Sequence, residues 1–520
     1  MSLRPGSSSG SSWKARKKSY KTGINAEDSR RRRVEDLVSI RKIKRQTTLL
    51  NKREEKHSCD TVSEAVPEIV KRLCDEYPHK QLEATAHLRT MLTLGDQAPP
   101  VDEVVKNGIL PRFVELLSRD DAPQLQIEVL WILSNFASGT SQHKSAVVEL
   151  GVIPILVNLL SSTDGDTREE AVCLLGNIVA DSPDHRDLAL NHGALKPLLC
   201  QLQPHSTLYM LRNATWCLSV LFLGMPPVNF EQVKIALPAL QQLVHATDEE
   251  VLTDTCWALA YLSEGQIGKS QAIVELGVCP RLVQLLHRHP SHSVIIPALQ
   301  ALGNIAAGDE AQAQFLIDNQ LLPCLHQLLT REYTKSIFKE ACWTIANITA
   351  GTRAQIQAVF DANIIPPLVQ ILHTAEFEVK REAVCAIYNV TSKGSYDNVR
   401  SLAAVGCIEA VCELLTCPDP KMVTLCLEGL VNILAVGEAD KDENGNIFAK
   451  RVEECGGLEK IETLQIHDNN EVHTRALWIS DLFRAENELE DTDMCVSLLD
   501  FSLGVNKPKS SSSSSSSYMR

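Results

Sequence analysis

The stretch EACWTIANITAG, residues 340–351, decides the fold. Residues three or four positions apart share one face of a helix, so Ala341 and Ile345 belong to a single apolar stripe. Trp343 and Asn347 lie on the opposite side of the same helix. An indole that points away from its own helix's apolar stripe needs a contact from elsewhere. The stretch therefore predicts a helix that packs through one face and binds a ligand through the other.

The same helix recurs along the chain at an interval of about 42 residues. Its copies include EVLWILSNFASG (128–139), EAVCLLGNIVAD (170–181), NATWCLSVLFLG (213–224) and DTCWALAYLSEG (254–265). A second motif accompanies them, as in GVIPILVNLL (151–160), where Gly ends one helix and Pro begins the next. Strand patterns are absent from the sequence. A period near 42 with three helices per unit is typical of armadillo repeats. We therefore predict an all-α, right-handed armadillo superhelix of about ten repeats.

Length, composition and cysteine usage limit the possible classes of protein. The chain has 520 residues, 44% of them hydrophobic, so it can bury a large core. Its 16 cysteines form no CxxC pair, and we interpret them as small buried residues, with neither disulfides nor a metal site. We find neither an apolar run of membrane-spanning length nor an apolar leader, and we expect no membrane insertion. No phosphate loop or nucleophile motif occurs, so we expect neither an enzyme nor a cofactor.

Charge divides the chain into a basic segment and an acidic body. Residues 1–56 hold 17 Lys/Arg against 6 Asp/Glu, a net +11, whereas the remainder holds 34 against 59, a net −25. Three basic clusters lie at residues 16–18, 30–33 and 41–45. We expect a basic segment over 1–56, helical in part, armadillo repeats over 57–485, and an acidic, then Ser-rich, disordered tail over 486–520. An acidic body repels phosphate, so we expect no nucleic acid partner.

The residues that share the Trp/Asn side of each repeat define a surface that we call the Trp/Asn face. Three positions before the Trp position, most repeats carry an acidic or amide residue: Glu128, Glu170, Asn213, Asp254, Glu340 and Glu382. An indole accepts the stem and charge of Lys or Arg, a carboxylate pairs with the cation, and Asn hydrogen-bonds a peptide backbone. A single helical Trp is usually a core residue, but four at one repeat phase indicate a concave groove for an extended basic peptide.

With these motifs and the Arg-rich segment, the chain resembles the importin-α family of nuclear import adaptors over nearly its whole length. The resemblance implies that the basic segment binds importin-β and that the groove binds basic nuclear localisation signals of cargo. It also implies an export receptor that contacts the acidic stretch 486–493, an indirect link to the nuclear pore, and shuttling between cytoplasm and nucleus. The alternative is an armadillo scaffold for signalling or cytoskeletal proteins, which has no need of the basic segment.

The resemblance also assigns residues to the binding sites. We add to them the acidic residues that stand three positions before the Trp position. The major peptide site would use Glu128, Trp131, Asn135, Gly139, Glu170, Asn177, Asp181 and Trp216, with Asp181 receiving the deeply bound lysine of the signal. The minor site would use Asn304, Glu310, Trp343, Asn347, Glu382 and Asn389. Asp254, Trp257 and Tyr261 would lie between the two sites. Importin-β would bind Arg30, Arg31, Arg32, Arg33, Arg41, Lys42, Lys44 and Arg45. Lys52 and Arg53 would be autoinhibitory.

Several positions depart from the family pattern. Cys173 and Cys385 stand where the family has Trp, and Val220 stands where it has Asn. Lys144 replaces a small polar residue near Asp181. A lost indole removes a cation–π contact of about 0.5–2 kcal/mol, so we expect a narrower range of cargo. The last basic triplet begins with Asn51, one charge short, so we also expect weaker self-inhibition.

Overall fold

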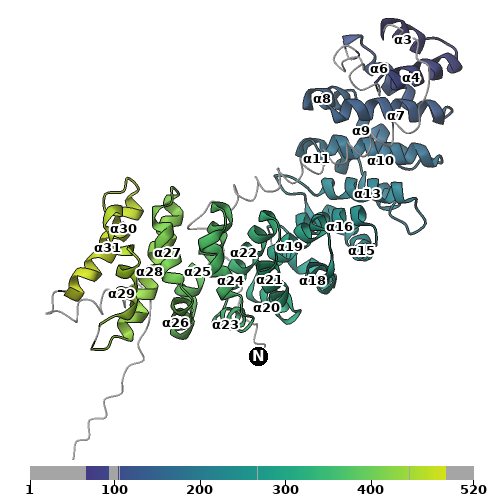
Figure 1. The fold of residues 1–520 in the computed structure, drawn as a ribbon. Helices are drawn as coiled ribbons and strands as arrows, with labels where there is room; N and C mark the ends of the chain where they lie inside the picture. The colour runs from purple at the N-terminus through teal and green to yellow at the C-terminus, as the bar shows by residue number, and fades with distance from the viewer. Residues whose placement is uncertain (1–65, 93–103, 105, 266, 444, 488–520) are drawn as a thin grey trace, which may run out of the picture. The chain divides into compact units, whose positions relative to one another are not determined.

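The computed structural model describes residues 66–92, 104, 106–265, 267–443 and 445–487. They fall into two compact units, which divide between Gly308 and Asp309. The described residues form α-helices and two short 3-10 segments, and no strand (Figure 1). The predicted all-α repeat architecture is confirmed for this part of the chain. The basic segment 1–56, including the residues expected to bind importin-β or to inhibit, and the tail beyond residue 487 lie outside the described residues.

The first unit, which ends at Gly308, is a stack of helix triplets. The third helix of each triplet packs against the third helix of the next, in the order α4, α7, α10, α13, α16 and α19. The helices of this unit are α3 (Val66–Leu73), α4 (Pro78–Leu92), α6 (Leu110–Leu117), α7 (Pro123–Ser138), α8 (Ser141–Glu149), α9 (Val152–Leu159), α10 (Gly165–Val179), α11 (Pro183–Asn191), α12 (Leu195–Leu199), α13 (Leu208–Leu221), α14 (Phe230–Val233), η2 (Lys234–Ala236), α15 (Leu237–Leu243), α16 (Glu249–Leu262), α17 (Ile267–Glu275), α18 (Cys279–Arg288) and α19 (His292–Ala306).

The second unit, which begins at Asp309, repeats the same arrangement. Its third helices α22, α25, α28 and α31 pack one on the next, which brings the number of described third helices to the expected ten. The helices are α20 (Glu310–Asp318), α21 (Leu321–Thr330), α22 (Lys335–Thr349), α23 (Arg353–Asp361), α24 (Ile365–Thr374), α25 (Phe377–Lys393), α26 (Tyr396–Ala404), α27 (Cys407–Glu413), η3 (Leu414–Thr416), α28 (Pro420–Ala439), α29 (Ile447–Glu454), α30 (Gly457–Leu464) and α31 (Asn470–Asn487).

Local sequence signals set the helix boundaries, as the triplet α8–α10 shows. The hydroxyl of Thr140 accepts a hydrogen bond from the His143 N–H and caps α8. Gly151 adopts a left-handed conformation, with φ of 78°, between α8 and α9. The Asp164 carboxylate caps α10 by accepting from the Thr167 N–H. These three signals separate the three helices of the repeat.

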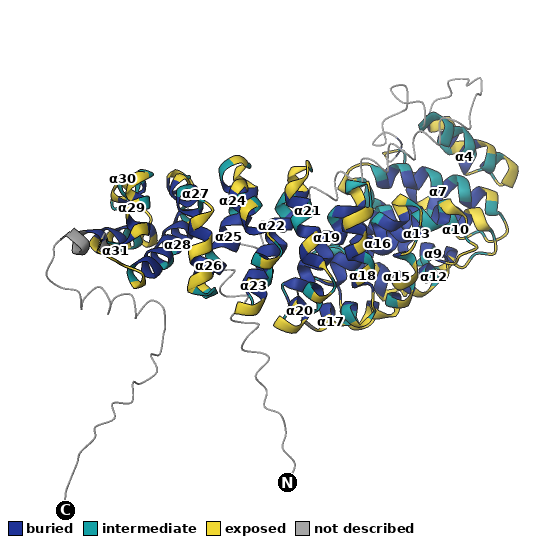
Figure 2. Ribbon diagram, turned by 60° about the horizontal axis from the view of Figure 1, so that its bottom comes forward, coloured by how far each residue is buried: buried dark blue, intermediate teal, exposed yellow. Residues whose placement is uncertain are grey.

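The core lies where the helices of neighbouring layers meet. In Figure 2 the third helices are largely coloured as buried. Cys256, Cys342 and Cys426 are buried as predicted, and burial raises the pKa of the Cys256 thiol to about 12. Helix α28 is long and apolar enough to cross a membrane by length and composition, but 78% of its apolar window is buried in the structure. We interpret α28 as a core helix of the second unit.

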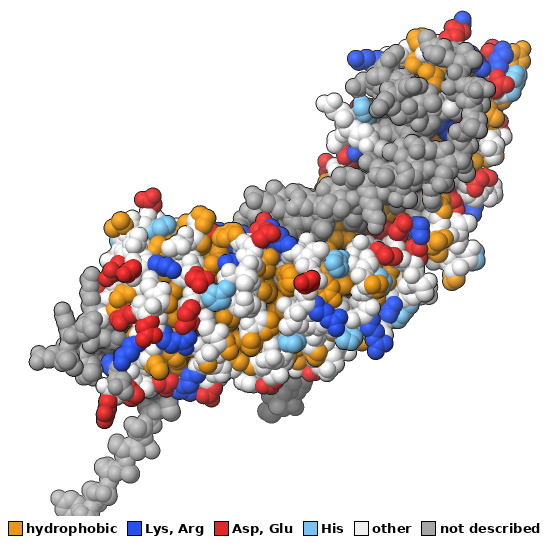
Figure 3. Space-filling view, viewed as in Figure 1, with side chains coloured by type: hydrophobic (Ala, Val, Ile, Leu, Met, Phe, Trp, Pro, Cys, Tyr) orange, Lys and Arg blue, Asp and Glu red, His pale blue; other side chains and the backbone are white. Residues whose placement is uncertain are grey.

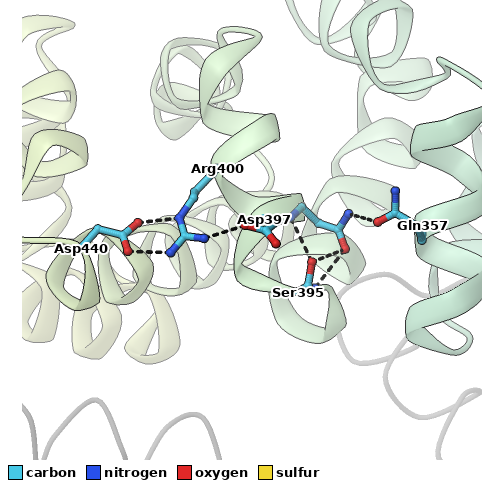
Figure 4. A network of polar contacts seen from close by, with 6 residues as sticks. Gln357, Ser395, Asp397, Arg400 and Asp440 are labelled. Carbon is cyan, nitrogen blue, oxygen red and sulfur yellow. Dashed lines mark hydrogen bonds and ion pairs between the residues drawn. The ribbon is translucent and has the colours of Figure 1, made fainter.

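Polar contacts around α26 connect neighbouring repeats of the second unit (Figure 4). The Arg400 guanidinium donates to both oxygens of Asp440, at 2.7 and 2.6 Å, and to Asp397 at 2.7 Å. The Arg400 hydrogen bonds lower the pKa of the Asp440 carboxyl. On the same helix, the Asn398 amide donates to Gln357 of α23 at 3.0 Å. Helix α26 is therefore tied through side chains to elements on either side of it in the sequence.

Candidate peptide-binding face

The structure places the predicted major-site residues on three adjacent third helices of the first unit. Trp131 and Asn135 lie one turn apart on α7, Asn177 lies on α10 and Trp216 lies on α13. Gly139 is the C-terminal cap of α7. These helices pack directly against one another, so consecutive repeats contribute to one surface.

An arginine of the preceding repeat occupies the first position of this surface. The Arg89 guanidinium of α4 lies 5.2 Å from the ring centroid of Trp131, and its Nε–H donates to the Glu128 carboxylate. Sequence reasoning missed Arg89. Its place in HLRTML (87–92), on the third helix one repeat earlier, is the signal that indicates it. The indole and the carboxylate together hold a cation, which is the chemistry predicted for the Trp/Asn face.

A glycine positions the second indole. A Cβ built at Gly176 of α10 would lie 2.3 Å from Cζ3 and 2.7 Å from Cε3 of Trp216. The Trp216 ring therefore lies directly on the backbone of the preceding repeat, where any larger residue would collide with it. The next residue is Asn177, whose Nδ2 is buried and has no hydrogen-bond partner among the described residues. This amide can still donate a hydrogen bond to a ligand carbonyl.

The carboxylate expected to receive a signal lysine is already paired within the chain. Lys144 Nζ of α8 donates to Asp181 Oδ1 at 2.9 Å, and Ser141 Oγ donates to the same oxygen at 3.1 Å. Both charged side chains are largely covered, with exposed fractions of 11% for Lys144 and 10% for Asp181. The site is thus built around an ion pair.

The predicted indoles are more deeply covered than an open groove implies. Trp216, Trp257 and Trp343 are only 4%, 2% and 5% exposed, and Trp131 is half-buried. Little of the surface of these three residues is therefore open to solvent. For Trp216 the reason is its seat on Gly176. Trp257 stacks on the ring of Tyr261, with centroids 5.5 Å apart.

Two amides assigned to the minor site also connect repeats. Asn304 Nδ2 donates to the Ala260 carbonyl at 2.8 Å within the first unit, and Asn389 Nδ2 donates to the Ala346 carbonyl at 2.9 Å within the second. The remaining minor-site residues also belong to the second unit: Glu310, which is exposed, and Trp343, Asn347 and Glu382, which are buried. Asp254, Glu170 and Glu340 are buried as well. Asn304 Nδ2 also donates to Ser263 Oγ at 3.1 Å, so both of its N–H groups are used within the chain.

Comparison with known proteins identifies the family. Five segments match the armadillo/beta-catenin-like repeat (97–138, 140–180, 182–222, 268–307 and 352–392), residues 446–494 match an atypical Arm repeat, and residues 16–86 match the importin beta binding domain. Importin subunit alpha-4 of Arabidopsis thaliana is 51% identical over 513 residues, and importin subunit alpha-1b of Oryza sativa subsp. japonica is 50% identical over 512. Both alignments cover 94% of each chain.

The chain belongs to the importin subunit alpha family. An engineered protein of known crystal structure also aligns with it, with a TM-score of 0.71 and 28% identity over 80% of this chain and 98% of that one. The relatives, the importin beta binding domain and the armadillo repeats together make the chain a nuclear import adaptor. They give no support to the scaffold alternative.

The three residues that differ from the family's Trp and Asn pattern on the third helices are buried. Cys173 is fully buried, and Cys385 and Val220 are nearly so. Burial raises the pKa of the Cys385 thiol well above its usual value. The two indoles of the family pattern are therefore replaced by buried cysteine side chains in this importin alpha fold. On the face of the second unit seen in Figure 3, acidic and basic side chains are interspersed.

Proposed function

We propose that this adaptor binds the basic nuclear localisation signals of cargo in an extended conformation along its Trp/Asn face. The major site lies on α7, α10 and α13, with Trp131, Asn135 and Trp216 in their predicted roles, and the minor-site residues form a second set. The basic segment 1–56 then carries the cargo complex to importin-β. No catalytic step belongs to this function.

The arrangement of Arg89 on Trp131 and Glu128 carries this proposal. The chain's own guanidinium lies over an indole while a carboxylate one turn away accepts its hydrogen bond. The same residue types recur at the same phase of later repeats, where a ligand's Lys or Arg would make the equivalent contacts. The buried Nδ2 of Asn177 supplies a donor for the ligand backbone.

We further propose that the adaptor shuttles between cytoplasm and nucleus. An importin beta binding domain at residues 16–86 supports entry with importin-β, which would make the contacts with the nuclear pore. Return to the cytoplasm requires an export receptor, for which the acidic stretch 486–493 is our candidate contact.

Peptide titration of the full chain tests the proposed site. Trp131→Ala with Asn135→Ala should weaken binding of a labelled basic peptide at least tenfold, because a cation–π contact and a backbone hydrogen bond are lost together. Tyr396→Ala removes an exposed aromatic ring from the first helix α26 and serves as the matched control. Affinity should also fall as salt rises, since the contacts are ionic. Unchanged affinity of the double variant would refute the site.

A further inference from the structure

The ion pair between Lys144 and Asp181 bears on which peptides the proposed site selects. Lys144 lies on α8, and Asp181 follows Ala180, the C-terminal cap of α10, so two helices of one repeat bring the charges together. The ammonium lies 2.9 Å from Asp181 Oδ1, and the Ser141 hydroxyl lies 3.1 Å from the same atom. The carboxylate therefore already has a cationic and a neutral donor from its own chain.

The low exposure of the pair makes it stronger than an ordinary surface contact. Side chains with 11% and 10% exposed surface have little water to screen them. A ligand ammonium that approached Asp181 would meet the Lys144 ammonium at close range. It would have to displace Lys144 or bind against a like charge, and either route lowers the gain from the new contact. A neutral ligand side chain meets no such opposition.

We infer that Lys144 is a specificity-determining residue, which competes with a ligand cation for Asp181 and removes the preference for lysine at that position of the peptide. The inference rests on the proposed function, because it concerns the same site. The selected ligands are extended basic peptides whose affinity is spread over several cations, without one dominant lysine.

The test uses the full chain and a set of basic peptides in which each lysine in turn is replaced by alanine. For the natural chain, each replacement should raise Kd by less than about threefold. Lys144→Met keeps the length of the side chain and removes its charge. In this variant, replacing the lysine at one peptide position should raise Kd about tenfold or more, which corresponds to the loss of one charge-assisted hydrogen bond. Lys144→Arg, which retains the charge, should behave like the natural chain.

Asp181→Asn separates specificity from fold. Added to Lys144→Met, it should abolish the new preference, because the carboxylate that favours the ligand lysine is gone. A purely structural effect of Lys144→Met would raise Kd for all peptides by one common factor and leave the ratios of their Kd values unchanged. This result would overturn the inference.

Two other outcomes distinguish the inference from the proposed function. In one, the natural chain already depends on a single lysine of the peptide, and Lys144→Met leaves that dependence unaltered. This outcome would overturn the role of Lys144 while the peptide site stands. The other is a failure of the natural chain and of every variant to bind any of the basic peptides. It would overturn the proposed function and the inference with it.

Discussion

Replacing Gly176 by alanine tests how the Trp/Asn face is built. The new Cβ would stand 2.3 and 2.7 Å from two carbons of the Trp216 ring, well inside van der Waals contact. Because the Trp216 side chain is only 4% exposed, the ring has little room to move away. Gly429, inside α28, is the matched control, since its nearest neighbour to a new Cβ is Thr391 Oγ1 at 3.9 Å.

The two substitutions should shift the free energy of unfolding in different directions. Alanine stabilises a helix interior relative to glycine by about 0.5–1 kcal/mol, and Gly429→Ala should show this gain. Gly176→Ala has the same gain but adds overpacking of about 1–3 kcal/mol. We therefore expect the change in the free energy of unfolding to be less favourable for Gly176→Ala than for Gly429→Ala by about 1–3 kcal/mol. Displacement of the indole should also weaken basic-peptide binding.

Native-state hydrogen exchange is the suitable assay, because a stack of repeats does not always unfold as one unit. Amides of α10 and α13 should exchange faster in Gly176→Ala, and amides of α28 more slowly in Gly429→Ala. In a Trp216→Ala background the penalty at Gly176 should disappear, since the colliding ring is gone. If Gly176→Ala instead protects α10 as much as Gly429→Ala protects α28, the indole does not lie on Gly176.

Three further predictions concern other parts of the chain. Hydrogen bonds from the Thr167 side chain and N–H lower the pKa of the Asp164 carboxyl, so this cap contributes stability above the unfolded-state pKa of about 3.9 and loses it as pH falls through the lower folded value. Asp164→Ala should lower the free energy of opening of α10, measured by hydrogen exchange, by about 1 kcal/mol at pH 7 and by less at pH 3; a constant cost would contradict this. Asn389→Ala should destabilise its repeat by about 0.5–1.5 kcal/mol, because the hydrogen bond to Ala346 is lost while that carbonyl keeps the Ala350 N–H as a donor. Asn177→Ala should chiefly weaken peptide binding; equal loss of amide protection in both variants would contradict this difference. Asn51→Lys should lower the apparent affinity of the full chain for free basic peptide, and importin-β should restore it; no change would exclude a competing role for this triplet.

The fold could be predicted from the sequence because its signals are local and repeated. Gly151 and the caps at Thr140 and Asp164 act within a few residues of themselves, and each set recurs in other repeats. Even where glycine is missing, Gln320 and Asn363 take positive φ values of 66° and 56° at the corresponding turns. Helical periodicity and turn chemistry therefore suffice for the architecture.

The candidate site could be predicted only in part. The phase of Trp131 and Asn135 identified the face, because residues four apart on a helix must share a side. The Arg89 contact and the cover of Trp257 could not be derived in this way. They depend on how one repeat rotates and rises against the next, and no spacing within a single helix determines that geometry. Lys144 was recognisable as unusual, but its 2.9 Å contact with Asp181 required coordinates.

The hydrogen bonds that asparagine side chains form between repeats bear on how such a chain changes over evolutionary time. Asn304 and Asn389 each donate to the main-chain carbonyl of the residue preceding the Asn position one repeat earlier, Ala260 and Ala346. Every amino acid offers that acceptor, so the bond demands no matching mutation in the neighbouring repeat. A gene that gains or loses a whole repeat by unequal recombination would present the amide with an equivalent carbonyl at once. The chain can therefore lengthen, shorten or diversify its side chains while the joint between adjacent repeats is preserved.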